Sequence, residues 1–211
     1  MKKLTIDGFF DVLRSLGGKR DITQSASYIS ANLKSYHRQQ LNDLYSTNWI
    51  ASKAVNIPVD DALKDGVTLS LEDTKQLEIF EKGLKAFKVE EKITNLAKWS
   101  KVFGGAVIVI VTNEDTMDTP LIIDNLKQGQ LKNLVVLDKL DITSVELERY
   151  PLSQDYLKPI YYQITKGGGN VHYSRVIHLD GENTTNYNRE LMNGWGLSVY
   201  ETGWTSILNA T

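Results

Sequence analysis

A helix that passes directly into an apolar strand, between residues 89 and 112, constrains the fold of this chain most. In its first part, apolar or small side chains recur at steps of three and four, on the face that carries Val89, Ile93 and Leu96. Gly104 and Gly105 then stand where a helix C-terminus favours positive φ, and an unbroken, mostly β-branched run follows at 106–111. Such a run is typical of a strand covered on both faces. We therefore expect residues 106–111 to form the central strand of a sheet.

The other periodicities place helical patterns mainly in the first half of the chain and strand patterns in the second. Helical spacing is found at 44–54, at 58–65, at 77–87 and from 195 onward. We expect Thr47 or Asn48 to cap the first of these helices and Pro58 to interrupt it and begin the next. Strand patterns are found at 67–71, 134–137, 142–145, 160–165 and 171–179. Their spacing is too irregular for a doubly wound array, so we predict an α+β fold in which helices pack on a small mixed sheet with a β-hairpin.

The composition of residues 1–40 differs from that of the rest of the chain. A short amphipathic segment is followed there by a polar stretch rich in Ser and Gln, which is typical of an arm or connector. We expect residues 41–211 to form one α+β domain.

The overall composition excludes several classes of protein. The chain has 211 residues, a net charge of −2 and no cysteine. The absence of cysteine excludes disulfides, thiolate nucleophiles and cysteine-ligated metals, and the charge argues against broad nucleic-acid binding. No apolar run approaches the roughly 20 residues that span a bilayer. These observations predict a soluble intracellular protein that has no cofactor, no metal site and no membrane contact.

Two motifs have a functional reading that we consider weaker than a structural one. Asp60 and Asp61 are adjacent carboxylates, but neighbours on a helix point about 100° apart and do not converge on one ion. We expect them to complement the dipole in the first turn of a helix. The glycines at 167–169 lie between two strand patterns, so they indicate a hairpin tip and not a phosphate-binding loop.

The histidines offer one element with catalytic chemistry. His172 and Ser174 match the H-x-[ST] element of two-histidine phosphoesterases, in which imidazoles act as acid and base beside hydroxyl donors. That chemistry needs two such elements, and the sequences around His37 and His178 do not supply the second. We therefore predict no catalytic residue, and keep His172 and Ser174 as the catalytic pair of an alternative hypothesis.

The tryptophans are candidates for contact with other molecules. A role in stacking on nucleic acid would favour interleaved lysine and arginine, which are sparse near Trp195 and Trp204. We expect core packing or subunit contact instead, with Trp49 and Trp195 as the candidate subunit contacts.

Four segments together carry a family resemblance. In order, they are Leu44 to Lys53 running into Val55–Asp61 and Gly66, then Ala97–Ala106 with its Trp99 and paired glycines, then Ser174–Gly181, and then Gly194–Val199. In residues, order and spacing they resemble tailed-bacteriophage portal proteins from about Leu41 to Trp204.

The resemblance implies a structural, non-enzymatic function. It implies a portal subunit of a ring, usually of twelve copies, at the capsid vertex through which DNA is packaged and ejected. The implied partners are further copies of the chain, capsid, terminase and tail-adaptor proteins, and double-stranded DNA that passes through without sequence-specific binding. The implied location is the virion, assembled in the host bacterial cytoplasm. The matching region corresponds to the portal wing, and relative to the family the chain is expected to be truncated before the stem and clip.

The alternative hypothesis belongs to a different class. Related phage sequences are labelled as hydrolases of cyclic oligonucleotide defence signals. This resemblance implies a two-histidine phosphodiesterase, in which His172 and Ser174 would serve.

Overall fold

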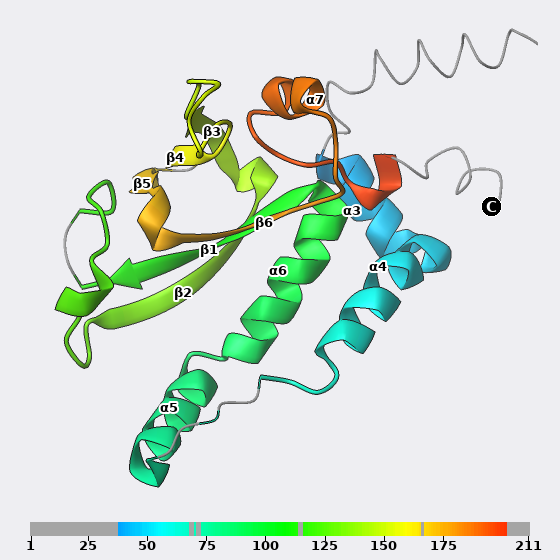
Figure 1. Ribbon diagram of the computed structural model, residues 1–211. Coiled ribbons are helices and arrows are strands. Elements are labelled where there is room, and N and C mark those ends of the chain that lie inside the picture. The colour runs from blue at the N-terminus through cyan, green and yellow to red at the C-terminus, as the bar shows by residue number, and fades with distance from the viewer. Residues whose placement is uncertain (1–37, 68–69, 71–72, 114–115, 166, 202–211) are drawn as a thin grey trace, which may run out of the picture. The chain divides into compact units, whose positions relative to one another are not determined.

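The computed structural model describes residues 38–67, 70, 73–113, 116–165 and 167–201. The chain divides into two units, Met1–Gln40 and Leu41–Thr211. The second unit has helices and small antiparallel sheets, which confirms the predicted α+β class (Figure 1). In the part of the chain that is described, no helix is both long and apolar enough to cross a membrane.

The first helices confirm the predicted cap at Asn48 but differ from the prediction in two places, because the helical pattern at 44–54 is divided between two helices and Pro58 does not interrupt the second. They are α3 (Arg38–Thr47) and α4 (Trp49–Leu63), and the side chain of Asn48 caps α4 by accepting from the backbone N–H groups of Ile50 and Ala51. The expected interruption at Pro58 is wrong, because α4 continues through this residue. Pro58 lies on the exposed side of the helix, where water can replace the hydrogen bond that proline cannot donate.

Two further helices precede the first strand. These are α5 (Thr74–Ala86) and α6 (Val89–Phe103), as their spacing predicts. α6 ends at Gly104, whose φ of 83° and backbone N–H bond to the carbonyl of Ser100 close the last turn.

The predicted central strand lies in the middle of the first sheet. This sheet has the order β2–β1–β6, formed by β1 (Gly105–Thr112), β2 (Leu131–Asp138) and β6 (Val176–Asp180). Both neighbours of β1 are antiparallel to it. Leu96 of α6 packs against Ala106 and Ile108, so α6 covers one face of the sheet (Figure 1).

The second sheet contains the predicted hairpin. Its order is β3–β4–β5, formed by β3 (Ile142–Leu147), β4 (Pro159–Ile164) and β5 (Gly169–His172). The glycines at 167–169 lie at the β4–β5 turn, as predicted. All described pairings are antiparallel and form two sheets, whereas the sequence suggested one mixed sheet. The run 171–179 is divided by the 3-10 turn Tyr173–Arg175, so its second half joins β1 instead of β4.

The main core lies between the two sheets. It contains Val107 and Val109 from β1, Tyr162 from β4, Val171 from β5 and Trp195 from the segment after α7 (Asn186–Leu191). The face of β1 opposite α6 therefore packs on the second sheet, which explains why its apolar run is continuous. The predicted strand at 67–71 and the predicted helix from 195 onward extend outside the described residues.

Candidate functional site

His172 and Ser174 form a hydrogen-bonded pair at the junction of β5 and the 3-10 turn Tyr173–Arg175. Nδ1 of His172 lies 2.8 Å from the Ser174 hydroxyl and accepts a second bond from the Ser174 backbone N–H at 3.3 Å. The Ser174 hydroxyl in turn accepts from the backbone N–H of Leu121 at 2.7 Å. Since Nδ1 accepts from a backbone N–H, it is unprotonated, and the proton of the neutral imidazole lies on Nε2.

The surroundings of His172 favour its neutral form. Its exposed fraction is 9%, and burial, followed by the charge of Arg175, lowers the pKa of the imidazole below its ordinary value. The ring of Tyr161 meets it edge-on at 5.2 Å, and the ring of Tyr173 lies at 4.5 Å. An imidazole that is neutral near pH 7 can accept a proton in catalysis.

Arg175 fixes the loop that borders this pair. Its guanidinium donates to the backbone carbonyl of Thr119 at 2.8 Å and to the hydroxyl of Thr112 at 3.0 Å, and the residue is 1% exposed. The backbone N–H of His172 also bonds the carbonyl of Met117 on the same loop. The loop is therefore tied to the end of β1 and to His172 at the same time.

His178 lies in a different environment from His172. Its Nε2–H donates to Asp180 at 2.7 Å and its Nδ1 lies 2.7 Å from the hydroxyl of Tyr162, so both ring nitrogens are engaged. Tyr162 contacts His178, whereas its neighbour Tyr161 contacts His172. Successive residues of a strand point to opposite faces, so the structure does not bring the two imidazoles together.

The bonds of His178 continue to α7. Asp180 accepts from Arg189 at 2.7 Å, and the His178 ring stacks on Trp195 at 4.5 Å. Burial raises the pKa of Asp180, but the hydrogen bonds and charges of His178 and Arg189 outweigh it and leave this pKa below its usual value. This network was not predicted from the sequence, although His178, Asp180 and Trp195 occur in the segments 174–181 and 194–199 that carry the family resemblance.

The two candidate subunit contacts differ in exposure. Trp49 is 74% exposed at the start of α4, whereas Trp195 is 5% exposed and packs in the core. Trp49 therefore remains a candidate contact, and Trp195 offers little surface to a partner.

The remaining candidates have structural roles or lie outside the described residues. Asp60 and Asp61 lie near the end of α4, and not in the first turn of a helix as expected. Asp60 pairs with Lys98 at 2.7 Å, and Asp61 pairs with Lys64 at 3.2 Å. Within the described ranges, no group of three or more His, Asp or Glu gathers as metal ligands do. His37 and Trp204 lie outside the described residues.

Comparison with curated proteins gives weakly similar relatives along nearly the whole chain. The chain is 25% identical to proteins named Anti-CBASS protein Acb1 from Caulobacter sp. (strain RHG1) and Sphingomonas paeninsulae, over 98% and 100% of its own length. An uncharacterized protein of Haemophilus influenzae is 26% identical over 93% of the chain. The chain covers 33%, 34% and 44% of these three proteins, respectively, and therefore spans less than half of each.

These names overturn two expectations from the sequence. A purely structural portal function and the absence of enzymatic activity were expected, but two relatives have the name of an anti-defence protein. The finding supports the alternative hypothesis better than the main one. The cause of the error is that the resemblance to portal proteins identifies a family, while function resides in particular sites of its members.

The family itself is shown by a match of the phage portal protein family to residues 39–211, which is most of the chain. This membership associates the chain with an oligomer and with the phage capsid. The chain belongs to the phage portal protein family.

Proposed function

We propose that this portal-family chain acts in evading cyclic-oligonucleotide defence, as a phosphodiesterase that hydrolyses the defence signals. The observation that carries the proposal is the alignment of nearly the whole chain with two proteins named Anti-CBASS protein Acb1. Because the chain covers only about a third of those proteins, the activity of the chain itself has to be tested.

His172 is the catalytic residue in this proposal. Burial and Arg175 favour the neutral imidazole, which a general base requires. To act as a base through Nε2, the neutral ring moves its proton from Nε2 to Nδ1. This change gives up the bond from the Ser174 backbone N–H to Nδ1, and the Ser174 hydroxyl then accepts from Nδ1–H. Nε2 removes a proton from the attacking water as the water oxygen bonds to phosphorus. The bond from phosphorus to the ribose oxygen breaks, and that oxygen takes a proton from solvent.

Ser174 is a positioning residue in the same proposal. Its hydroxyl bonds both Nδ1 of His172 and the backbone N–H of Leu121, so it sets the ring against the loop. His178 takes no part, because both of its nitrogens are bound to Tyr162 and Asp180. The proposal therefore departs from the two-histidine scheme and relies on one imidazole.

The test is turnover of cyclic di- and trinucleotides by the chain, followed by chromatography of the linear products. We expect His172→Ala to lower the rate by at least about 100-fold, the usual loss when an acid–base group is removed. The full-length Caulobacter relative serves as the reference protein under the same conditions. If that protein hydrolyses the signals and this chain does not, the catalytic role of this chain is refuted.

His178→Asn is the matched histidine control. It removes hydrogen bonds from the network with Asp180, so we expect a lower melting temperature but an unchanged rate per folded molecule. Ser174→Ala should reduce the rate less than His172→Ala and alter its pH profile, because the ring then loses the hydroxyl that fixes Nδ1. Equal losses in the His172 and His178 variants would indicate a general structural effect and contradict the assignment.

We also propose that copies of the chain associate in a ring and are carried in the virion. Family membership supports an oligomeric protein that is associated with the capsid. The ring arrangement and the location in the virion are the parts that we propose. Mass spectrometry of purified particles tests the location. The contacts with terminase, tail adaptor and DNA stay predictions.

A further inference from the structure

Tyr173 lies beside the candidate catalytic histidine and keeps more than half of its surface in solvent. The centroid of its ring is 4.5 Å from that of His172, at an interplanar angle of 41°, and the residue is 53% exposed. The hydroxyls of Tyr162 and Tyr200 are bonded inside the protein, whereas the hydroxyl of Tyr173 forms no hydrogen bond with the described residues. Neither burial nor a hydrogen bond therefore explains a tyrosine at this position.

The backbone on both sides of Tyr173 is held in place. The backbone N–H of His172 bonds the carbonyl of Met117, and the Ser174 hydroxyl accepts from the backbone N–H of Leu121. Tyr173 itself begins a 3-10 turn. Binding to a group in a fixed position loses less conformational entropy than binding to a mobile one, so this ring is preorganised for contact.

The other side chains near the imidazole offer a substrate little surface. His172 is only 9% exposed, so its own ring provides a small part of the contact that holds a substrate. Arg175, the basic residue of the turn, is 1% exposed, and its guanidinium bonds Thr112 and the backbone of Thr119 inside the protein. Among residues 172–175, Tyr173 alone is exposed.

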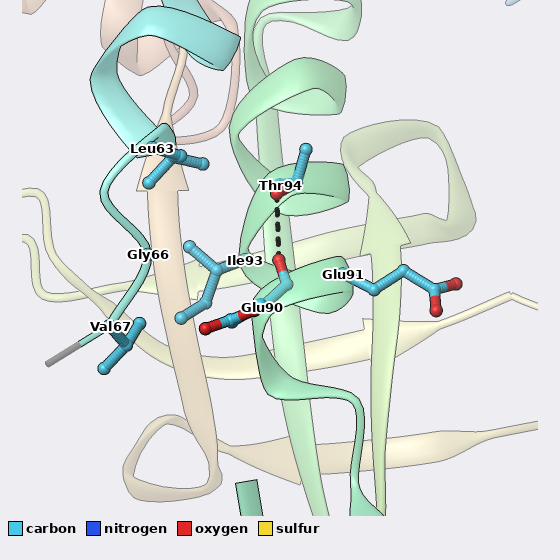
Figure 2. A pocket seen from close by; sticks show the side chains of 7 residues that line it. All are labelled: Leu63, Gly66, Val67, Glu90, Glu91, Ile93 and Thr94. Atoms are coloured by element: carbon cyan, nitrogen blue, oxygen red, sulfur yellow. Dashed lines mark hydrogen bonds between the residues drawn. The ribbon is translucent and has the colours of Figure 1, made fainter. Parts of the chain in front are cut away.

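The pocket shown in Figure 2 does not serve this histidine. It has a volume of about 180 Å³, and its residues come from the end of α4, the segment after it and the first turns of α6. They are Leu63, Gly66, Val67, Glu90, Glu91, Ile93 and Thr94. None of them belongs to β4, β5 or the turn that carries Tyr173. A substrate of His172 therefore needs contacts on the surface beside the imidazole.

We propose that the ring of Tyr173 stacks on a nucleobase of the cyclic oligonucleotide, next to the phosphodiester at which His172 acts. The inference rests on the proposed function and adds the contact that holds the substrate. Every base has a π face, so stacking on an aromatic side chain contributes to binding without particular hydrogen bonds. One ribose joins each phosphate to its base, so the two groups can contact two side chains that are themselves in contact. Tyr173 is thus a substrate-binding residue and takes no part in proton transfer.

Steady-state kinetics with a cyclic dinucleotide tests this contact. Tyr173→Ala should raise KM about 10-fold, within the range of base stacking, and leave kcat unchanged, because the imidazole keeps its bonds to Ser174. Tyr173→Phe retains the ring and should retain the original KM. Tyr173→Leu retains an apolar side chain without a π face and should resemble the alanine variant. A full KM in Tyr173→Leu would overturn stacking.

Tyr150→Ala is the matched control for the loss of an exposed tyrosine. Tyr150 is 61% exposed and lies between β3 and β4, away from the turn that carries Tyr173. This variant should change neither KM nor kcat. A rise in KM equal to that of Tyr173→Ala would mean that the effect is not specific to the ring beside His172, and would overturn the proposal.

A ligand without bases tests what the ring contacts. The same cyclic ribose phosphate, with hydrogen in place of both bases, should bind more weakly than the dinucleotide. Tyr173→Ala should not weaken the binding of this ligand further, because the partner of the ring is already absent. An equal loss for both ligands would show that Tyr173 does not act on a base, and would overturn the proposal.

Calorimetry separates this inference from the proposed function. The titrant is a phosphorothioate analogue of the dinucleotide that resists hydrolysis, so Kd is measured without turnover. Binding that weakens about 10-fold in Tyr173→Ala, in a chain that hydrolyses no substrate, would support stacking and refute the phosphodiesterase. Turnover with an unchanged KM in Tyr173→Ala would refute stacking and leave the phosphodiesterase. A chain that does not bind the analogue refutes both.

Discussion

Replacing Gly105 by alanine tests the packing at the centre of the fold. An added Cβ would lie 2.3 Å from Cε3 and 2.8 Å from Cζ3 of the Trp195 ring, closer than real Cβ atoms approach. The ring cannot move aside easily, since it is 5% exposed and is stacked on His178. Overpacking of a core costs about 1–3 kcal/mol, and these contacts place Gly105→Ala near the upper end, at about 3 kcal/mol.

The expected loss is measurable by thermal unfolding. For a chain of this size, 1 kcal/mol corresponds to roughly 2–4 °C in melting temperature, so Gly105→Ala should melt about 6–12 °C lower. Circular dichroism gives the melting temperature, and tryptophan fluorescence reports the displaced ring. A change within about 0.5 kcal/mol of the original protein would refute the packing argument.

Gly83→Ala is the matched control for this substitution. Gly83 lies within α5, and a Cβ there would meet nothing within 4 Å. Alanine is the better helix former, so the same chemical change should stabilise α5 by about 0.5–1 kcal/mol. A destabilising effect at both glycines would mean that the loss at Gly105 is not caused by Trp195.

Three further predictions concern other parts of the structure. Tyr200→Phe removes the bond from the buried hydroxyl to the backbone carbonyl of Ala51 at 2.9 Å, so it should cost about 0.5–1.5 kcal/mol in urea unfolding. Pro58→Ala restores a helix N–H within α4 and should stabilise the chain by about 1–3 kcal/mol in the same experiment; no gain would contradict the continuous helix. The pKa of His172 is lowered, so its contribution to stability is present above about pH 6.5 and is lost as pH falls through the folded pKa. Melting curves from pH 7.5 to 5 should therefore decline less in His172→Gln than in the original protein, and identical slopes would contradict this assignment.

Much of the local structure could be predicted because it depends on neighbouring residues. The spacing of Val89, Ile93 and Leu96 predicted α6, and Gly104 correctly marked its end. The apolar run that follows predicted the central strand, since a strand that is covered on both faces has no water-exposed face that would require polar side chains.

The failures have a common physical cause, which is tertiary contact. Pro58 does not end α4, because Val55 and Val59 are buried on either side of it and hold both parts of the helix against the core. The run at 171–179 reads as one strand, but Ser174 and Arg175 turn the chain toward the loop at 117–121 and divide the run between two sheets.

The candidate site was only partly predictable. The sequence singled out His172 and Ser174 by their spacing, and the structure joins them by a hydrogen bond. Spacing could not show that His178 is enclosed by Tyr162 and Asp180, because these contacts connect different strands. The function could not be inferred from the family resemblance for the same reason, since the resemblance concerns the framework and not a site.

The pairing of β1 with β6 has a consequence for synthesis on the ribosome. Val107 pairs with His178, and Gly105 is covered by Trp195, so β1 finds these partners only after about 70 to 90 further residues have been made. At roughly 5–20 residues per second, the nascent chain holds this apolar strand without its final cover for several seconds or longer. Newly made copies of this chain therefore have a period in which β1 is vulnerable to aggregation, and slowing translation between β2 and β6 should lower the yield of soluble protein.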